Sequence, residues 1–142
     1  MNAGARTFRA LAVVGACLAP PIALAQEQIE VFVVGDQQIA GAAGAGAVYH
    51  VDALARQLEE LSAGLPADPE RAAAIAKARF ERLTSAELTR LQTGAEVEEL
   101  ARRYGLLKAP AMVIDGRAVI YGVHDVDRAR AIYRAWRARQ GG

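Results

Sequence analysis

The chain has 142 residues and a mass of 15.1 kDa, which corresponds to one domain of ordinary size and excludes a multidomain enzyme. Hydrophobic residues make up 53% and charged residues 23%, a composition that excludes intrinsic disorder for most of the chain. The 17 basic and 16 acidic residues leave a net charge of only +1, so no strong field favours nucleic acid as a partner. The single cysteine excludes an intramolecular disulfide, a dithiol redox pair and a cysteine-based zinc site.

Residues 1–25 predict a secretory signal peptide. Two arginines precede the uncharged run Ala10–Leu18, and residues 23–25 (Ala-Leu-Ala) form a small-x-small cleavage signal. A membrane anchor is the first alternative, but the run is shorter than the ~20 apolar residues that a spanning helix needs. Lipidation of Cys17 is the second, but that residue lies inside the apolar run. We therefore expect export to the periplasm and a cysteine-free mature domain, 26–142, without a transmembrane segment.

Hydrophobic periodicity and the residues that interrupt it predict an α/β chain in the order β-α-β-α-α-β-β-α. Strands are expected at 28–34, 48–51, 111–114 and 118–121. Helical segments are expected at 53–62, from 69 to about 91, at 96–104 and at 126–139, and the Ala- and Gly-rich segment 37–46 is expected to be a loop or a poor helix.

Local signals predict where these elements begin and end. Asp52, Asp68 and Asp125 stand at helix starts, and Thr84 or Ser85 re-caps the second helix. Gly94 marks a weak point in the helical stretch. We expect one buried sheet covered by apolar helix residues; the sheet residues are Val31, Phe32, Val33, Val113, Ile114, Val119 and Ile120, and the covering residues are Leu58, Phe80, Leu100 and Ile132.

The stretch from residue 100 to residue 122 resembles the thioredoxin-like fold. A helix ends at Gly105, Pro110 stands directly before a strand, and Asp115-Gly116 turns the chain into the returning strand. The resemblance implies a thioredoxin-like domain over 26–142, with a central mixed sheet of about four strands, a helical insertion and a C-terminal helix. In that fold the proline is cis and faces the active site.

The mature chain also resembles a narrower group, the short exported proteins of integrating conjugative elements. The most specific matching pieces are Leu65-Pro-Ala-Asp-Pro69 and the segment from Pro110 to Gly122, Pro-Ala-Met-Val-Ile-Asp-Gly-Arg-Ala-Val-Ile-Tyr-Gly. The resemblance covers about residues 28–135. It implies an accessory protein of a conjugative, type IV secretion-like transfer apparatus, with other envelope proteins as partners, and it supplies no molecular activity.

The residues argue against catalysis. A thioredoxin-like oxidoreductase needs a thiolate after the first strand, and that position holds Asp36, Gln37 and Gln38. His50 and His124 are the only histidines, so a metal site would depend on carboxylates for its other ligands. We therefore predict a protein that is not an enzyme and that has no cofactor and no metal. An enzyme using His50 and carboxylates is the weaker alternative.

The resemblance also implies a candidate binding groove. In the thioredoxin-like fold the backbone beside the cis-proline accepts an extended chain by strand addition. Here those groups would come from Ala109 and Ala111, on either side of Pro110, and would face a loop that includes Asp36, Gln37 and Gln38. The alternative is that Pro110 only shapes the turn into the strand.

The last predicted helix carries five arginines, Arg128, Arg130, Arg134, Arg137 and Arg139. They are either a patch for phosphate, lipid or an acidic partner, or the solvated side of an amphipathic helix. For the whole protein the sequence leaves three hypotheses: a non-catalytic accessory protein of conjugative transfer, a periplasmic peptide-binding or chaperone-like domain, and the enzyme named above.

Overall fold

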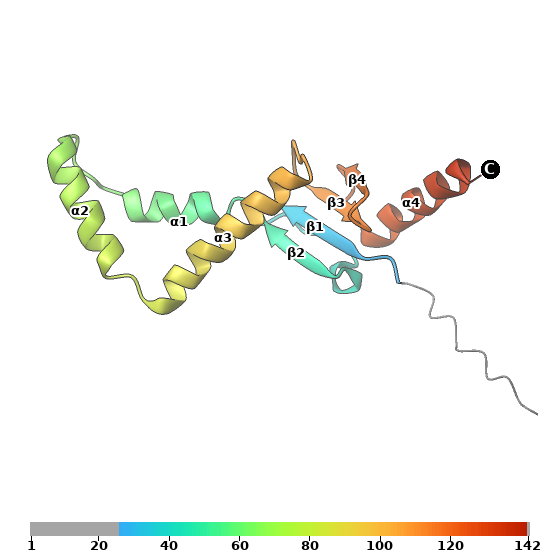
Figure 1. Cartoon of the computed structure of the whole chain (residues 1–142), viewed down its shortest axis with the longest axis horizontal. Helices are drawn as coiled ribbons and strands as arrows, with labels where there is room; N and C mark the ends of the chain where they lie inside the picture. Colours follow the sequence, from blue (N-terminus) through green and yellow to red (C-terminus); the bar gives the residue numbers. More distant parts are fainter. Residues whose placement is uncertain (1–25, 142) are drawn as a thin grey trace, which may run out of the picture.

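The computed structural model describes residues 26–141, so the predicted signal peptide lies outside the described residues. Figure 1 shows an elongated molecule with a small sheet between a helical arm and a C-terminal helix. Its elements are β1 (Ile29–Val33), a 3-10 turn (Ala42–Gly44), β2 (Ala47–His50), α1 (Ala53–Ser62), α2 (Pro69–Glu81), α3 (Ser85–Arg103), β3 (Ala111–Ile114), β4 (Ala118–Tyr121) and α4 (Val126–Gln140). The insertion between β2 and β3 thus contains three helices, and the segment between β1 and β2 forms only the 3-10 turn.

The four strands form one mixed sheet in the order β2-β1-β3-β4. β1 is parallel to β2 and antiparallel to β3, and β3 is antiparallel to β4. Phe32 is the register partner of Tyr49 on one side and of Ala111 on the other. The predicted α/β class, with a mixed sheet of four strands, a helical insertion and a C-terminal helix, is confirmed.

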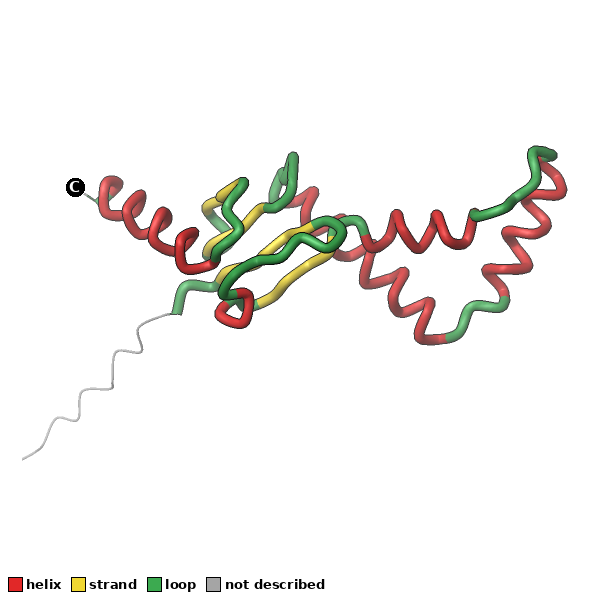
Figure 2. The backbone as a smooth tube through the Cα atoms, turned by 180° about the vertical axis from the view of Figure 1, so that it is seen from behind, coloured by secondary structure: helices red, strands yellow, loops and turns green. Residues whose placement is uncertain are grey.

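One face of the sheet is covered by α4, which Figure 2 shows beside the strands. Val31 and Met112 from the two central strands meet Val126, Ala129 and Tyr133 of the helix, and all five are buried. The Tyr133 hydroxyl also donates to Asp115 Oδ2 at 2.8 Å, which ties α4 to the β3–β4 turn. This hydrogen bond is the main reason that the pKa of Tyr133 is raised.

The other face is covered by the C-terminal end of α3. Phe32 and Val113 are fully buried there, with Leu100 and Tyr104 packed against them. The Tyr104 hydroxyl donates to Glu30 Oε2 at 2.5 Å, and this bond raises the pKa of Tyr104. Each face of the sheet is therefore tied to its helix by a hydrogen bond from a tyrosine to a carboxylate.

Local start and turn signals are confirmed at four places. The side chains of Asp68 and Asp125 each accept an N–H three residues on, at 2.8 Å, and α2 begins with a proline. Thr84 and Glu87 form a capping box at the start of α3. Asp115 and Gly116 both have positive φ, 54° and 63°, in the three-residue connection between β3 and β4, where Arg117 N–H donates to the Ile114 carbonyl at 3.0 Å.

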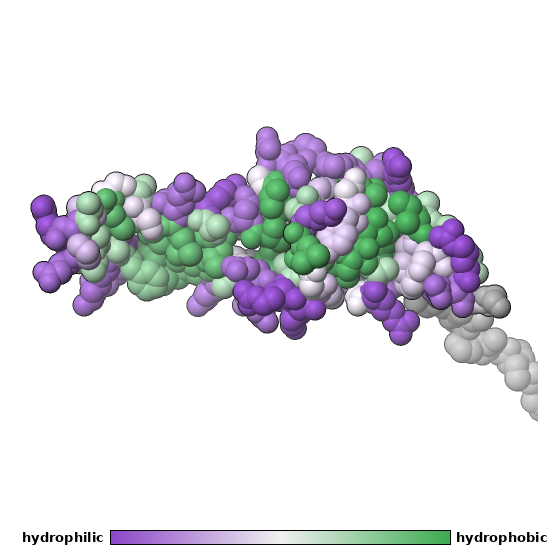
Figure 3. Space-filling view, turned by 90° about the horizontal axis from the view of Figure 1, so that it is seen from above, coloured by the Kyte–Doolittle hydropathy of each residue, from purple (hydrophilic) through white to green (hydrophobic). Residues whose placement is uncertain are grey.

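The helical arm, which comprises α1, α2 and the N-terminal half of α3, does not lie on the sheet. No residue of α1 or α2 is buried, and Figure 1 shows these helices extending away from the strands. The prediction that Leu58 and Phe80 cover the sheet is wrong, because these residues are 48% and 56% exposed. Ile132 on α4 is also 42% exposed. From above, apolar surface follows the arm between charged borders (Figure 3).

Gly94 is not a weak point, because α3 continues through it from Ser85 to Arg103. Gly94 is buried where α1 crosses α3, and a Cβ built on it would lie 3.1 Å from the Leu54 backbone nitrogen and 3.2 Å from Leu54 Cα. The glycine is needed for close approach of two helix backbones rather than for flexibility. Among residues 26–141, no helix combines the length and apolar character that crossing a membrane requires.

Gly94→Ala tests this crossing. In an exposed helix the change would stabilise by up to ~1 kcal/mol, but here the new methyl group meets Leu54 backbone atoms that cannot rotate away. We expect a loss of about 1–3 kcal/mol in the free energy of unfolding, measured by urea titration. Gly44→Ala is the matched control, since nothing lies within 4 Å of its added Cβ. An equal or greater stability for Gly94→Ala would show that α1 and α3 do not approach so closely.

Candidate functional site

The candidate site lies at the end of the sheet where β1 and β2 finish. β1 leads into the loop that carries Asp36, Gln37 and Gln38, and β2 leads into Asp52. The antiparallel register continues β1 past Phe32–Ala111, so Val34 comes opposite Ala109. The loop after β1 therefore leaves the sheet at the end where the Ala109–Pro110 segment enters β3. The Ala109–Pro110 peptide bond is cis.

Backbone groups alternate along β1 between its two neighbours. Asp115 N–H donates to the Gln28 carbonyl at 2.8 Å, so Gln28 and every second residue after it face β3. Gly46 N–H and Val51 N–H donate to the carbonyls of the intervening residues Ile29 and Val33, which face β2. Val34 is therefore the next residue in line to pair with β3, at the position opposite Ala109.

That pairing is not formed. The Val34 N–H donates instead to the Gln37 side-chain oxygen at 3.1 Å, and the Val34 carbonyl accepts from the Gln37 N–H at 3.3 Å. Gln37 thus turns the chain back on itself and ends β1. Within residues 26–141, neither the N–H nor the carbonyl of Ala109 has a hydrogen-bond partner. Ala109 is half-buried and presents one donor and one acceptor at the edge that β1 leaves open.

The other predicted groove residues play different parts. Ala111 is fully buried in β3 between Phe32 and Tyr121, so its backbone belongs to the sheet and is not open to a ligand. The Pro110 carbonyl accepts from Gly122 N–H at 3.0 Å. Asp36 and Gln38 are exposed, and the Gln38 amide donates to the Asp36 carbonyl at 3.1 Å.

Asp52 joins the two strand ends, and its predicted N-cap position is confirmed, although its side chain makes no capping hydrogen bond. Asp52 stands at the N-cap position, but its Oδ2 accepts from Gly35 N–H at 3.0 Å and lies 3.2 Å from Arg56 Nε. Its Oδ1 is buried with no hydrogen-bond partner in the described part of the chain. Asp52 therefore holds the start of the loop after β1 instead of the first turn of α1.

The environment of Asp52 favours its charged form. Partial burial acts to raise the pKa of the carboxyl, but hydrogen bonds from the Gly35 and Asp52 N–H groups and the charge of Arg56 outweigh it, so the pKa is lowered. A carboxyl whose pKa is lower in the folded state stabilises the fold fully above its unfolded pKa, ~3.9. That stabilisation is lost as the pH falls through the lowered folded value.

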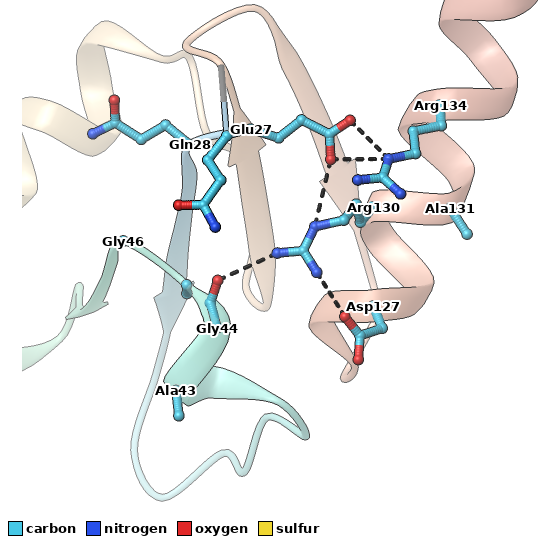
Figure 4. Close-up of a pocket in the computed structure, with 11 residues that line it drawn as sticks. Glu27, Gln28, Ala43, Gly44, Gly46, Asp127, Arg130, Ala131 and Arg134 are labelled. Atoms are coloured by element: carbon cyan, nitrogen blue, oxygen red, sulfur yellow. Dashed lines mark hydrogen bonds and ion pairs between the residues drawn. The ribbon is translucent and has the colours of Figure 1, made fainter. Parts of the chain in front are cut away.

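A separate groove of about 1280 Å³ lies at the opposite end of β1, between Gln26–Gln28, the 3-10 turn and α4 (Figure 4). Glu27 crosses it, with its carboxylate 2.9 Å from Arg134 Nε and 3.4 Å from Arg130 Nε. Arg130 also lies 2.6 Å from Asp127 and donates to the Gly44 carbonyl at 3.3 Å. The polar side chains of this groove are thus largely engaged with one another.

Two of the five arginines of α4 therefore hold the start of the described chain against the helix. Only 12% of the Glu27 side chain is exposed, so the pair is more than a loose surface contact. Arg130 and Arg134 therefore belong neither to a binding patch nor to a merely solvated side of α4, because both pair with Glu27. Sequence patterns could not reveal this role, because Glu27 carries no motif and lies far from α4 in the chain.

Of the two histidines, only His50 lies near the candidate site, where its charge helps to lower the pKa of Asp52. His50 is exposed at the end of β2, and His124 is exposed in the loop before α4, where its carbonyl accepts from Ala40 N–H at 2.8 Å. Among residues 26–141, no cluster of three or more His, Cys, Asp or Glu side chains could hold a metal ion.

Asp52→Asn tests the link between the strand ends. The change removes the attraction to Arg56 and weakens the bond from Gly35, so we expect a loss of about 1 kcal/mol in the free energy of unfolding at neutral pH. The difference from wild type should shrink as the pH falls below ~4, because wild-type Asp52 then takes up a proton as well. Urea unfolding at a series of pH values measures both effects.

Asp36→Asn is the matched control, since the Asp36 side chain is exposed and takes part in no hydrogen bond or ion pair within residues 26–141. It should follow wild type at every pH. A constant difference between wild type and Asp52→Asn down to acid pH would show that the charge of Asp52 contributes nothing.

A family model matches residues 26–139, which is most of the chain and contains the whole sheet and every helix except the last residue of α4. The match begins at the residue that follows the predicted cleavage point. No curated protein and no solved structure matches the chain, so the thioredoxin-like arrangement stays a prediction. The chain belongs to the family described as protein of unknown function, DUF1525.

Proposed function

We propose that the protein is a non-catalytic, exported accessory protein of the conjugative, type IV secretion-like transfer apparatus of an integrating conjugative element. The context rests on the resemblance of the Leu65–Pro69 and Pro110–Gly122 segments, and the periplasmic location rests on the predicted signal peptide. The proposed partners are other envelope proteins of the apparatus. The proposed mode of action is binding of an extended segment of such a partner at the open edge beside Pro110.

The observation that carries this binding mode is the unformed pairing between Val34 and Ala109. Ala109 offers an N–H and a carbonyl at the end of a central strand, and Gln37 keeps Val34 from taking them. An added strand satisfies such groups with its own backbone. The same end of the sheet carries no thiol, since residues 26–142 contain no cysteine, which favours binding over dithiol chemistry.

Apolar side chains flank this edge. Leu107, three residues before Pro110, is 90% exposed, and Val34 is 37% exposed. Leu107 N–H donates to the Tyr121 hydroxyl at 3.3 Å, so its backbone is anchored although its side chain is free. An extended partner that paired with Ala109 would bring its own side chains against Leu107 and Val34. Apolar residues in the partner segment are therefore expected.

A periplasmic peptide-binding or chaperone-like domain is the second candidate. It is favoured because the open groups are the backbone N–H and carbonyl of Ala109, and hydrogen bonds to these groups do not depend on the side chains of the partner. Small alanine side chains on both sides of Pro110 add little selectivity. The two candidates share the site and differ in the range of partners.

A photo-reactive amino acid at position 107 tests the site and separates the candidates. Leu107 is almost fully exposed, so the replacement should leave the fold intact. Ultraviolet cross-linking in cells that carry the element should join the protein to a small set of envelope proteins of the transfer apparatus. Many unrelated unfolded proteins would instead favour the chaperone-like candidate.

The same probe at Ala73, an exposed position on α2, is the control. Its cross-links should not include the proteins captured from position 107. If both positions capture the same proteins, or if position 107 captures none, the open edge is not the binding site.

Export has its own test, the intact mass of the protein recovered from the periplasm. Cleavage after residue 25 predicts a chain that begins at Gln26 and contains no cysteine. A lipid-modified mass would assign Cys17 as the processing site instead. A full-length chain in the cytoplasm would contradict both the location and the proposed partners.

A further inference from the structure

The helical arm carries an open pocket. α1, α3 and the residues after α2 line this pocket of about 240 Å³, with Leu61, Leu83 and Leu91 as its apolar residues and Glu60, Glu87 and Arg90 as its charged ones. Its volume is roughly eight times the ~30 Å³ that a water molecule occupies in the liquid, which suits one large side chain. We call these six residues the arm cup.

α4 carries a surface of the opposite charge. Ile132 and Trp136 are each 42% exposed, and Arg128 and Arg139 follow the same side of the helix at spacings of three and four residues. In the described part of the chain, neither arginine forms an ion pair, unlike Arg130 and Arg134. Trp136 stacks on the buried Tyr133 with ring centroids 5.9 Å apart, so its position is fixed. We call these four residues the α4 patch.

The two surfaces complement each other in charge and in shape. In the arm cup two glutamates outnumber one arginine, and Glu87 is held charged because its hydrogen bonds with Thr84 lower its pKa. The α4 patch combines two arginines with two exposed apolar side chains, one of them the only tryptophan of the chain. An aromatic side chain in an apolar pocket with arginines around it is the usual composition of an interface centre.

We propose that the arm cup of one copy of this chain receives the α4 patch of a second copy. Figure 1 shows the arm and α4 at opposite ends of the molecule, so one copy cannot bring the two surfaces together itself. Trp136 would enter the cup against the leucines, and Arg139 and Arg128 would approach Glu60 and Glu87. The contact joins different surfaces, so it propagates head to tail and either closes into a ring or grows as a filament.

This assembly also accounts for two features that a single copy leaves unexplained. α1 buries no residue, although a helix of its length, 10 residues, is marginal without packing, and Glu60 and Leu61 of α1 line the cup. α4 leaves a tryptophan half-exposed beside the core that its neighbours cover. The proposal does not depend on the function proposed above, which uses the backbone beside Ala109.

The test is the mass of the purified protein in solution as a function of concentration, by light scattering and sedimentation velocity. Wild type should form species larger than a monomer, and Trp136→Ala should weaken the association by at least about tenfold. Glu60→Arg blocks the cup and Arg139→Glu blocks the patch, and each alone should be monomeric. Both replaced side chains are exposed, and circular dichroism checks that the variants are folded.

Mixing distinguishes this contact from any other. Glu60→Arg retains an intact patch and Arg139→Glu an intact cup, so the two variants should associate when mixed although neither does so alone. Their two altered surfaces also carry opposite charges, so the mixture should assemble beyond a pair. The double variant Glu60→Arg/Arg139→Glu, with its charges exchanged, should regain self-association. Glu96→Lys, a charge change on the exposed surface of α3 outside the cup, should assemble like wild type. A wild type that is monomeric at all concentrations, or single variants that assemble normally or do not complement each other, would overturn the proposal.

Discussion

The antiparallel pairing of β1 with β3 is the contact on which the rest of this structure depends. It joins two strands that the helical insertion separates in the chain and places Phe32, Val31, Val113 and Met112 in the middle of the sheet. Both faces of this strand pair are apolar. α4 covers one face, and the C-terminal end of α3 covers the other. β2 and β4 then add at the edges.

The same pairing explains why the candidate site is made of backbone. β1 and β3 stay paired as far as Phe32 and Ala111. Two residues after Phe32, Gln37 forms hydrogen bonds with both the N–H and the carbonyl of Val34. Ala109 is left at the end of a central strand, where hydrogen-bonding groups are normally paired. The side chains predicted for the site, Asp36 and Gln38, lie at its border and are engaged locally or exposed. This end of the sheet therefore leaves open the backbone N–H and carbonyl of Ala109.

Elements with short-range signals could be predicted closely from the sequence. The α1 helix has the predicted bounds, and the caps at Asp68, Thr84 and Asp125 and the turn at Asp115 are in place, because each depends on residues a few positions apart. The Pro110 segment was found by resemblance, since its position at the strand entry has a recognisable pattern.

Features that depend on long-range packing could not be predicted. The apolar stripes of α1 and α2 do not reveal that these helices extend away from the sheet. The sequence predicts a weak point at Gly94, because it does not show that α1 crosses α3 there. It also does not show that the Asp52 side chain accepts a hydrogen bond from Gly35. The pairing of Glu27 with Arg130 is a contact between chain segments that share no local pattern.

The position of the arm between β2 and β3 has a consequence for how the molecule comes apart. The sheet is assembled from two separate stretches of chain, one carrying β1 and β2 and the other carrying the end of α3, β3, β4 and α4. A single cut in the exposed connection between α2 and α3 would sever the polypeptide without touching either buried cluster. The β1–β3 hydrogen bonds would still join the two halves, so the protein is suited to division into two fragments that reassemble from separate chains.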